Sequence, residues 1–223
     1  PVPSALPTVS PAPTPAPTPH PTHDYTDVVV TASMWYDYCG GQTWSYGTTF
    51  DNKTVFVTDS TNVANFIAAK DIWFDSSVAG RVSYSAYADD DDDDLYIGLF
   101  DLATQGIFVV WNMQYSRLYI REATSGYEGT SSCSASAATN LASATASFAK
   151  DEWVTLEVGW DNATISVLAI NADGDRFEVS SANSATYGAG QLQVGTGYMY
   201  GSTYFADLKI HSALPVPSAL PTV

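Results

Sequence analysis

The densest group of ionisable side chains in the sequence is an unbroken run of six aspartates. Adjacent carboxylates repel one another at neutral pH, so a bound cation would relieve part of the repulsion. Calcium suits such a segment, because it takes about six to eight oxygen ligands, mostly from carboxylates and carbonyls. The alternative is a solvated acidic loop that keeps the protein soluble. The candidate calcium ligands are Asp89, Asp90, Asp91, Asp92, Asp93 and Asp94.

A second acidic segment, from Asn171 to Asp175, begins like a calcium-binding loop. It lacks the glutamate that closes such loops, and it lies between two stretches that are expected to be strands. Asp173 followed by Gly174 is typical of a two-residue hairpin turn. The sequence therefore favours a turn over a metal site at this position.

Covalent attachment of carbohydrate is the next chemistry that the sequence predicts. Asn52 and Asn162 each begin an Asn-x-Thr sequon for N-glycosylation, although such triplets also arise by chance. The segment from Ser10 to Thr22 reads SPAPTPAPTPHPT, with proline at every second position. Segments rich in Ser, Thr and Pro are typical O-glycan acceptors, and the alternative is an unmodified spacer.

Alternating proline also favours a stiff polyproline II rod, since each ring fixes its own φ and extends the residue before it. The spaced SP, AP and TP dipeptides resemble the arabinogalactan-type, hydroxyproline-rich glycoproteins of plants and algae. The resemblance implies that several of these prolines are hydroxylated and carry sugars. The candidate acceptors are Thr8, Ser10, Pro11, Pro13, Thr14, Pro15, Pro17, Thr18, Pro19, Pro21 and Thr22.

Two cysteines, Cys39 and Cys133, are present. An even number in a chain of secreted character predicts an internal disulfide, and the alternatives are two free thiols or a bond to another copy. The pair cannot form a zinc site alone, because such a site needs several convergent ligands. The three histidines, His20, His23 and His211, all lie beside the proline-rich segments.

No arrangement of catalytic side chains stands out. Glycoside hydrolysis needs two facing carboxylates, and none of the five glutamates falls in an E-x-D-x-E type of pattern. Glu152 and Glu157 are an odd number of residues apart, so on one strand they would point to opposite faces. A serine hydrolase would need a G-x-S-x-G turn, which the sequence lacks. The sequence predicts a protein that is not an enzyme.

Aromatic side chains are abundant, with 14 tyrosines and 6 tryptophans. Three interpretations stay open for the clustered ones. They can pack in the core, stack on sugar rings, or receive the proline-rich segment of a neighbouring copy, since polyproline II rods bind aromatic-lined grooves. The candidates for stacking or docking are Trp35, Tyr36, Trp44, Tyr198 and Tyr200.

The distribution of proline divides the chain into three segments. Nine of the 12 prolines lie between Pro1 and Pro21, and none lies between His23 and Leu214. Because proline lacks the N–H that a central strand donates, the middle can form a sheet and the ends cannot. We expect an extended stalk at 1–23, a globular domain at 24–211 and the start of a second stalk at 212–223.

Short runs of β-branched and aromatic residues, separated by Gly, Asn, Asp and Ser, fill the globular segment. Several alternate with period two, as in a half-buried strand, whereas Asn62–Lys70 is expected to be a short helix or irregular. About a dozen such strands predict an all-β fold, an antiparallel two-sheet β-sandwich or jelly roll. The expected strands are Val28–Ala32, Val55–Thr58, Ile72–Asp75, Val82–Tyr87, Leu95–Phe100, Ile107–Met113, Leu118–Ile120, Val154–Trp160, Ile165–Ile170, Phe177–Val179, Leu192–Gly195 and Tyr204–Ile210.

The last third of the domain resembles the late strands of concanavalin A-like jelly rolls, which laminin-G-type domains and glucanase-like modules share. The stretch DEWVTLEVGWDNATISVLAI matches a hairpin of the W-x-x-L-x-V kind, and YFADLKI matches the closing strand. The resemblance implies a jelly-roll fold, and calcium at the rim of the sandwich. It implies no single activity, because this fold carries lectins, hydrolases and adhesion modules.

Residues 1–9 and 215–223 have the same sequence, PVPSALPTV. The repeat predicts one period of a tandem array, and the alternative is a stalk motif that flanks a single domain on both sides. We therefore expect a structural subunit of an extracellular glycosylated fibre, whose partners are copies of itself and covalent glycans. A calcium-dependent carbohydrate-binding, lectin-like module on a stalk is the alternative function.

The charge of the chain excludes two classes of partner. The formal net charge is −16, with 24 acidic against 8 basic residues. Nucleic acids and anionic membranes both attract basic surfaces, so neither is an expected partner. No apolar run is long enough for a transmembrane helix. Together with the sequons and the proline-rich stalk, these features predict a secreted, extracellular protein.

Overall fold

The computed structural model describes most of the globular segment and none of the proline-rich ends. The described ranges are 26–27, 31–37, 44–59, 65–75, 78–89, 94–99, 106–123, 138–148, 150–161, 164–182, 189–197 and 202–212. Within these ranges no helix is long and apolar enough to span a membrane. The predicted stalk acceptors, both cysteines, Asn162, Asp90–Asp93, Tyr198 and Tyr200 lie outside the described residues.

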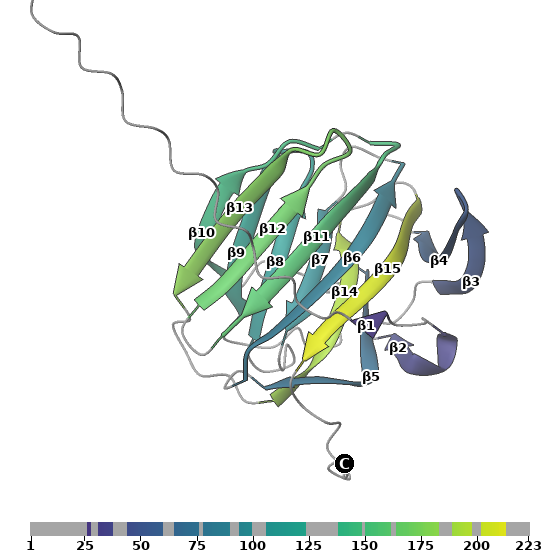
Figure 1. Ribbon diagram of the computed structural model, residues 1–223, viewed down its shortest axis with the longest axis horizontal. Coiled ribbons are helices and arrows are strands. Elements are labelled where there is room, and N and C mark those ends of the chain that lie inside the picture. The colour runs from purple at the N-terminus through teal and green to yellow at the C-terminus, as the bar shows by residue number, and fades with distance from the viewer. Residues whose placement is uncertain are drawn as a thin grey trace, which may run out of the picture.

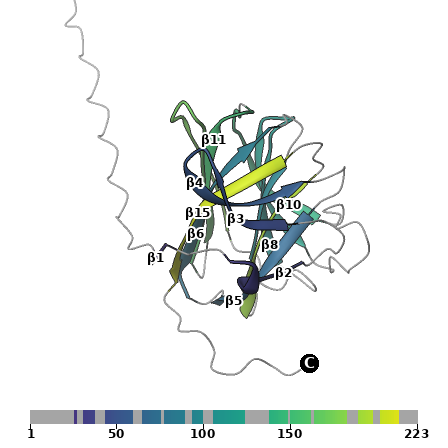
Figure 2. The ribbon, with the colours of Figure 1, turned by 90° about the vertical axis from the view of Figure 1, so that its right-hand side faces the viewer.

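Two antiparallel sheets pack face to face as a sandwich (Figures 1 and 2). The eight-stranded sheet has the order β13 (Arg176–Ala182), β12 (Thr164–Ile170), β11 (Trp153–Trp160), β6 (Gly80–Ala88), β15 (Ser202–Ser212), β4 (Lys53–Asp59) and β3 (Trp44–Phe50), with β1 (Thr26–Asp27) also paired to β15. The seven-stranded sheet has the order β10 (Ala138–Thr145), β9 (Arg117–Ala123), β8 (Gly106–Asn112), β7 (Asp94–Leu99), β14 (Ala189–Gly197), β5 (Asn65–Asp75) and β2 (Trp35–Asp37). A 3₁₀ turn, η1 (Ala32–Met34), precedes β2. The all-β sandwich prediction is confirmed.

The core lies between the two sheets and follows the predicted alternation. In β11, Val154, Leu156 and Val158 are buried, while the residues between them are half-buried on the outer face. Leu156 stands opposite Tyr84 on one neighbouring strand and Ala169 on the other, and both of these are buried. In β11, therefore, one face supplies the core and the other face carries polar side chains.

Of two tryptophans that the sequence left open, Trp35 belongs to this core and Trp44 packs against it. Trp35 is 3% exposed and stacks on Phe56 with ring centroids 5.7 Å apart. Trp44 packs against the core, with its ring 6.1 Å from Phe56 and 5.9 Å from Phe205. Their position favours the core-packing interpretation, because a sugar or a proline-rich segment stacks on an accessible ring.

The expectation of a short helix or irregular segment at Asn62–Lys70 is wrong for its described part. Strand β5 begins at Asn65, and Ile67 and Ala69 within it are completely buried. Hydrogen-bonded pairing with β14 on one side and β2 on the other imposes the extended conformation. Tertiary pairing here outweighs the weak local pattern.

Strand β15 departs from the alternation expected over residues 204–210. Its register with β6 shifts between Ala206 and Lys209, and Asp207 has a positive φ of 52°. The resulting β-bulge puts both Phe205 and Leu208, three positions apart, into the core, whereas strict alternation would place them on opposite faces. Tyr204, expected on the same face as Leu208, instead pairs with Tyr87 on the outer face of the sheet.

The acidic segment between β12 and β13 is a turn, as the sequence predicts. The Gly174 N–H donates to the Asn171 carbonyl at 3.0 Å, and the Asp175 N–H donates to Asn171 Oδ1 at 2.8 Å. Gly174 has a φ of +84°, which glycine adopts without strain. The asparagine side chain therefore closes the turn.

Candidate functional site

A sharp hairpin joins β3 to β4 and folds over the outer face of the eight-stranded sheet. Its turn consists of Asp51 and Asn52, which have φ values of 47° and 61°. A two-residue hairpin turn of this kind requires positive φ at both positions, and Asp and Asn tolerate it better than most residues. We call Phe50–Lys53 the hairpin tip.

The hairpin tip rests on an aromatic surface formed by three neighbouring strands. Phe50 stacks on Tyr204 of β15 with ring centroids 3.9 Å apart, and contacts Tyr87 of β6 edge-on at 4.9 Å. Trp153 of β11 lies 6.2 Å from Phe50 and completes the group. Because Tyr87 pairs with both Trp153 and Tyr204 in register, the three rings form one row across the sheet.

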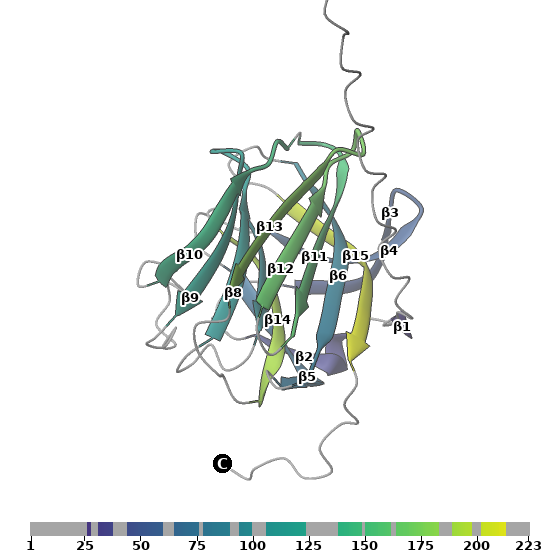
Figure 3. The ribbon, with the colours of Figure 1, turned by 60° about the vertical axis from the view of Figure 1, so that its left-hand side comes forward.

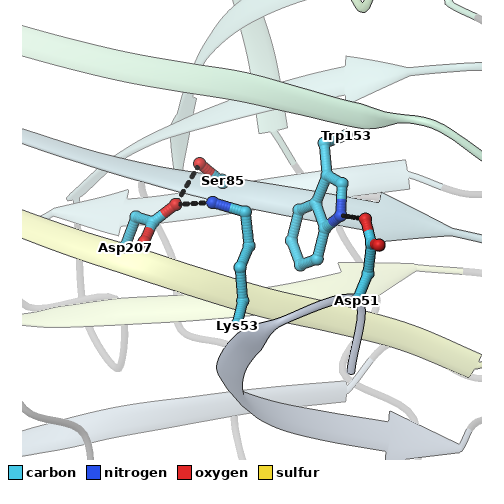
Figure 4. A network of polar contacts seen from close by, with 5 residues as sticks. All are labelled: Asp51, Lys53, Ser85, Trp153 and Asp207. Atoms are coloured by element: carbon cyan, nitrogen blue, oxygen red, sulfur yellow. Dashed lines mark hydrogen bonds and ion pairs between the residues drawn. The ribbon is translucent and has the colours of Figure 1, made fainter. Parts of the chain in front are cut away.

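Polar contacts also hold the tip on the sheet (Figure 4). The Trp153 indole N–H donates to Asp51 Oδ2 at 2.7 Å. The Lys53 ammonium forms an ion pair with Asp207 Oδ2, and it also lies 5.1 Å from the centre of the Trp153 ring. The Ser85 hydroxyl donates to the same Asp207 oxygen at 3.1 Å. We call the tip with its partners the hairpin-tip cluster.

The electrostatics of this cluster are balanced. Partial burial alone would raise the pKa of Asp207, but the hydrogen bond and charge of Lys53 lower it below its usual value, with help from Ser85 and Lys209. Burial and the neighbouring Asp151 carboxylate, which accepts a 3.5 Å hydrogen bond from the Tyr87 hydroxyl, raise the pKa of Tyr87. The charges and rings of the hairpin-tip cluster thus satisfy one another.

The outer face of the seven-stranded sheet carries a different polar group, which we call the Asp94 cluster: Asp94 and Tyr96 from β7, Asn112 from β8 and Arg121 from β9. Asp94 stands opposite Asn112 in the β7–β8 register, and Arg121 lies on the same face four positions along. The Tyr96 hydroxyl donates to Asp94 Oδ2 at 2.9 Å. Arg121 Nε donates to Asn140 Oδ1 at 2.8 Å, which orients its guanidinium group over the Tyr119 ring.

Asp94 is the unusual member of this cluster. It is 5% exposed, and within the described part of the chain its Oδ1 atom is buried with no hydrogen-bond partner. Burial raises the pKa of Asp94 to about 7, although Tyr96, Arg121 and Asn112 act in the opposite direction. A buried carboxylate oxygen without a partner is costly to keep, so it is a candidate acceptor for a ligand hydroxyl or a cation.

The two described ends of the aspartate run lie in different sheets. Asp89 follows β6 of the eight-stranded sheet, and its Oδ1 accepts the Ser202 N–H at 2.7 Å. Asp94 begins β7 of the seven-stranded sheet. In the described residues no three His, Cys, Asp or Glu side chains lie close enough to hold a metal ion. Calcium at the run therefore stays a prediction.

The remaining candidates can be placed only in part. Asn52 is exposed at the hairpin tip. Tyr36 lies in β2, with only its backbone described. The sequence did not point to the aromatic row of Tyr87, Trp153 and Tyr204, although the Asp51-Asn52 pair between two strand-like runs is a recognisable turn signal.

Comparison with known proteins supports the fold. No protein-family model matches the chain, and no curated protein matches it in sequence. Among solved structures, the carbohydrate-binding module CBM66 from Bacillus subtilis matches with a TM-score of 0.59 and 11% identity, over 80% of this chain and 96% of that one. A Bacillus subtilis protein of unknown function with a galectin-like fold matches with a TM-score of 0.57 and 10% identity, over 84% of this chain and 98% of that one. The Lotus tetragonolobus seed lectin matches with a TM-score of 0.53 and 8% identity, over 87% of this chain and 100% of that one. These similarities show a galectin- and legume-lectin-like β-sandwich.

Proposed function

We propose that this chain is a repeating unit of an extracellular, glycosylated fibre in which the sandwich hangs beside a proline-rich axis. One structural observation carries the proposal. Strand β1, where the chain enters the sandwich, pairs with the last residues of β15, where the chain leaves it. The two proline-rich segments therefore attach at neighbouring points.

The register defines this junction. Thr26 stands opposite Ile210 and Asp27 opposite Lys209, in antiparallel orientation. β1 pairs with the end of β15 at which the chain leaves the domain. The two proline-rich segments are therefore connected to the same end of this strand pair. β10, an edge strand of the seven-stranded sheet, lies on the far side of the molecule from β1 (Figure 3). The sandwich is thus a side group rather than a link in series.

The proline-rich segments suit the axis of such a fibre. Residues 215–223 repeat residues 1–9, so each unit would end with the beginning of the next linker. From Ser212 to His23 of the next unit is about 26 residues, roughly 80 Å as a polyproline II rod. A net charge of −16 per chain keeps neighbouring sandwiches apart. Sugars on the Ser, Thr and Pro acceptors would stiffen the rod further.

A role without catalysis fits the described carboxylates. Glu157, on the outer face of β11, accepts a 2.7 Å hydrogen bond from Arg81, and the two opposite charges form an ion pair. Glu152 is exposed just before the same strand. We therefore include the absence of enzymatic activity in the proposal.

Electron microscopy of the native extracellular material tests this proposal. The expected result is a continuous thin filament with globular domains displaced to one side at a regular axial repeat. Mass spectrometry of the same material should find peptides that run from Ser212 directly into the PVPSALPTV segment and on to the next unit. Discrete, unlinked monomers would exclude the fibre.

A second function, carbohydrate binding, is favoured by the Asp94 cluster. The unpartnered Asp94 Oδ1 can accept a hydrogen bond from a sugar hydroxyl, while the amide of Asn112 and the guanidinium of Arg121 can donate to neighbouring sugar oxygens. The neighbouring CBM66 structure is that of a carbohydrate-binding module. This function is compatible with the fibre, because the cluster lies on a face that takes no part in the β1–β15 junction.

Glycan-array binding of the full chain, with calcium and with a chelator, tests the second function. Asp94→Ala, which removes both side-chain oxygens, should abolish binding, whereas Asp207→Ala, on the opposite sheet, should leave it unchanged. Retained binding in Asp94→Ala would place the sugar elsewhere. Loss of binding in chelator alone would add calcium to the site.

A further inference from the structure

Three of the four residues of the hairpin tip have engaged side chains, and one does not. Phe50 stacks on Tyr204, Asp51 accepts the Trp153 indole N–H, and Lys53 pairs with Asp207. Asn52, between them, is exposed and makes no side-chain hydrogen bond or ion pair with the described residues. The tip therefore holds its neighbours fixed and leaves the carboxamide of Asn52 accessible.

The accessible carboxamide is also the acceptor of an Asn-Lys-Thr sequon, and the third position is accessible too. Thr54 is exposed near the start of β4. Lys53, at the middle position, has its charge neutralised by Asp207. The backbone of Asn52 has a φ of +61° at the apex of the turn, where a bulky group can extend into solvent.

We propose that Asn52 carries an N-linked oligosaccharide, which the hairpin-tip cluster holds at a fixed position over the outer face of the eight-stranded sheet. This modification is separate from the proline-linked sugars of the proposed fibre. It requires only that the chain passes through a compartment with an N-glycosylating transferase and its lipid diphosphate-linked oligosaccharide donor.

The transfer step balances with that donor. The amide nitrogen of Asn52 forms a bond to the anomeric carbon of the first sugar, and the bond between that carbon and the phosphate oxygen breaks. The lipid diphosphate leaves with the electron pair, and the amide proton passes to a basic carboxylate of the transferase. No oxidant or reductant is involved.

The position of the glycan follows from the anchors on either side of it. An oligosaccharide on a free loop would sweep a wide volume, but here the stack of Phe50 on Tyr204 precedes its attachment residue. The Lys53 ion pair, drawn in Figure 4, follows it. The sugar would therefore cover the hairpin tip and leave the Asp94 cluster, on the opposite sheet, uncovered.

The test uses the full chain secreted from a eukaryotic host, with the peptide from native material analysed in parallel. Thr54→Ala removes the sequon and Thr54→Ser keeps it, while both leave Asn52 and the anchors in place. Wild type and Thr54→Ser should yield a glycopeptide at position 52, which amidase treatment converts to an unglycosylated peptide with an aspartate there. Thr54→Ala should lose the glycopeptide completely.

The outcomes that overturn the proposal are equally defined. An unmodified Asn52 peptide in wild type from both sources excludes the modification. A glycopeptide that persists in Thr54→Ala places the sugar on another residue. Because fibre formation is scored separately by microscopy, failure of this proposal leaves the proposed function standing, and the converse also holds.

Discussion

The two outer faces of the sandwich each carry an aspartate in a polar cluster, and the two carboxylates titrate in opposite directions. Asp207, on the eight-stranded sheet, is 42% exposed and binds Lys53 and Ser85, and its pKa is lowered. Asp94, on the seven-stranded sheet, is 5% exposed with one oxygen unpartnered in the described structure, and burial raises its pKa to about 7. One face has its aspartate paired, and the other keeps a buried carboxylate oxygen without a partner among the described residues.

This difference separates a structural cluster from a candidate binding site. Paired charges and stacked rings at the hairpin tip stabilise the fold, and the charged groups of Lys53, Asp51 and Asp207 are already engaged there. A buried acceptor without a donor lowers the stability of the free protein, and such costs are commonly retained at functional sites. The comparison can be tested by changing each aspartate and its neighbours separately.

The largest expected effect is that of Asp94→Asn on the pH dependence of stability. The pKa of Asp94 is about 7 in the folded protein, so the carboxyl keeps its proton up to that pH, whereas in the unfolded chain it loses the proton near the ordinary pKa of 3.8. Between these values the folded state binds more protons, so the free energy of unfolding falls as the pH rises, by about 4 kcal/mol in all, and is flat above.

The asparagine of the Asp94→Asn variant cannot ionise, so the variant should lack this fall in the free energy of unfolding. It should be more stable than wild type at pH 8 and similarly stable at pH 4. Urea unfolding at a series of pH values measures the difference. If wild type and variant keep parallel pH profiles, Asp94 is hydrated or paired in solution and the contrast between the two faces disappears.

The next effect in size is that of Phe50→Ala at the hairpin tip. This change removes the ring that stacks on Tyr204 and contacts Tyr87 and should destabilise the protein by about 2 kcal/mol, less than for a fully buried ring. Tyr115→Ala is the matched control, because Tyr115 is 68% exposed and its loss should cost under about 0.5 kcal/mol. Equal midpoints in chemical denaturation for the two variants would show that the tip does not pack on the sheet.

The smallest expected effect concerns the Lys53–Asp207 ion pair. A double-mutant cycle with Lys53→Met and Asp207→Asn should give a coupling of about 0.5 kcal/mol that weakens in high salt, because both side chains are partly exposed. The lowered pKa of Asp207 means that this stabilisation is present above about pH 4 and is lost as the pH falls below it, opposite in sign to Asp94. A coupling that is unchanged by salt would contradict a partly exposed pair.

Sequence reasoning predicted the sheets better than the sites. Strands such as β11 were clear, because Val154, Leu156 and Val158 alternate with polar residues. Strands β3 and β10 were missed, since WSYGTTF and ATNLASAT contain mostly Ser, Thr, Ala and Gly and have little apolar alternation. Their pairing with β4 and β9 supplies the missing information.

The candidate sites depend on contacts that no local pattern contains. Asp94 is the last of six identical residues, and only its position at the start of β7 distinguishes it from the others. Asp89, the first residue of the run, follows a strand of the other sheet and accepts a hydrogen bond from Ser202. Phe50 and Trp153 are about a hundred positions apart in sequence, so their contact appears only when the hairpin folds over the sheet.

The short β1–β15 pairing gives the proposed fibre a distinctive response to force. Tension along the axis would enter at Thr26 and leave at Ser212, which lie beside each other at one end of the same strand pair. In this geometry the force would separate β1 from β15 one residue pair at a time, and would not shear the two strands past each other. The force would not pass through the core. Each unit would lengthen slightly when β1 detaches, and would shorten again when β1 pairs with β15 after the tension is removed.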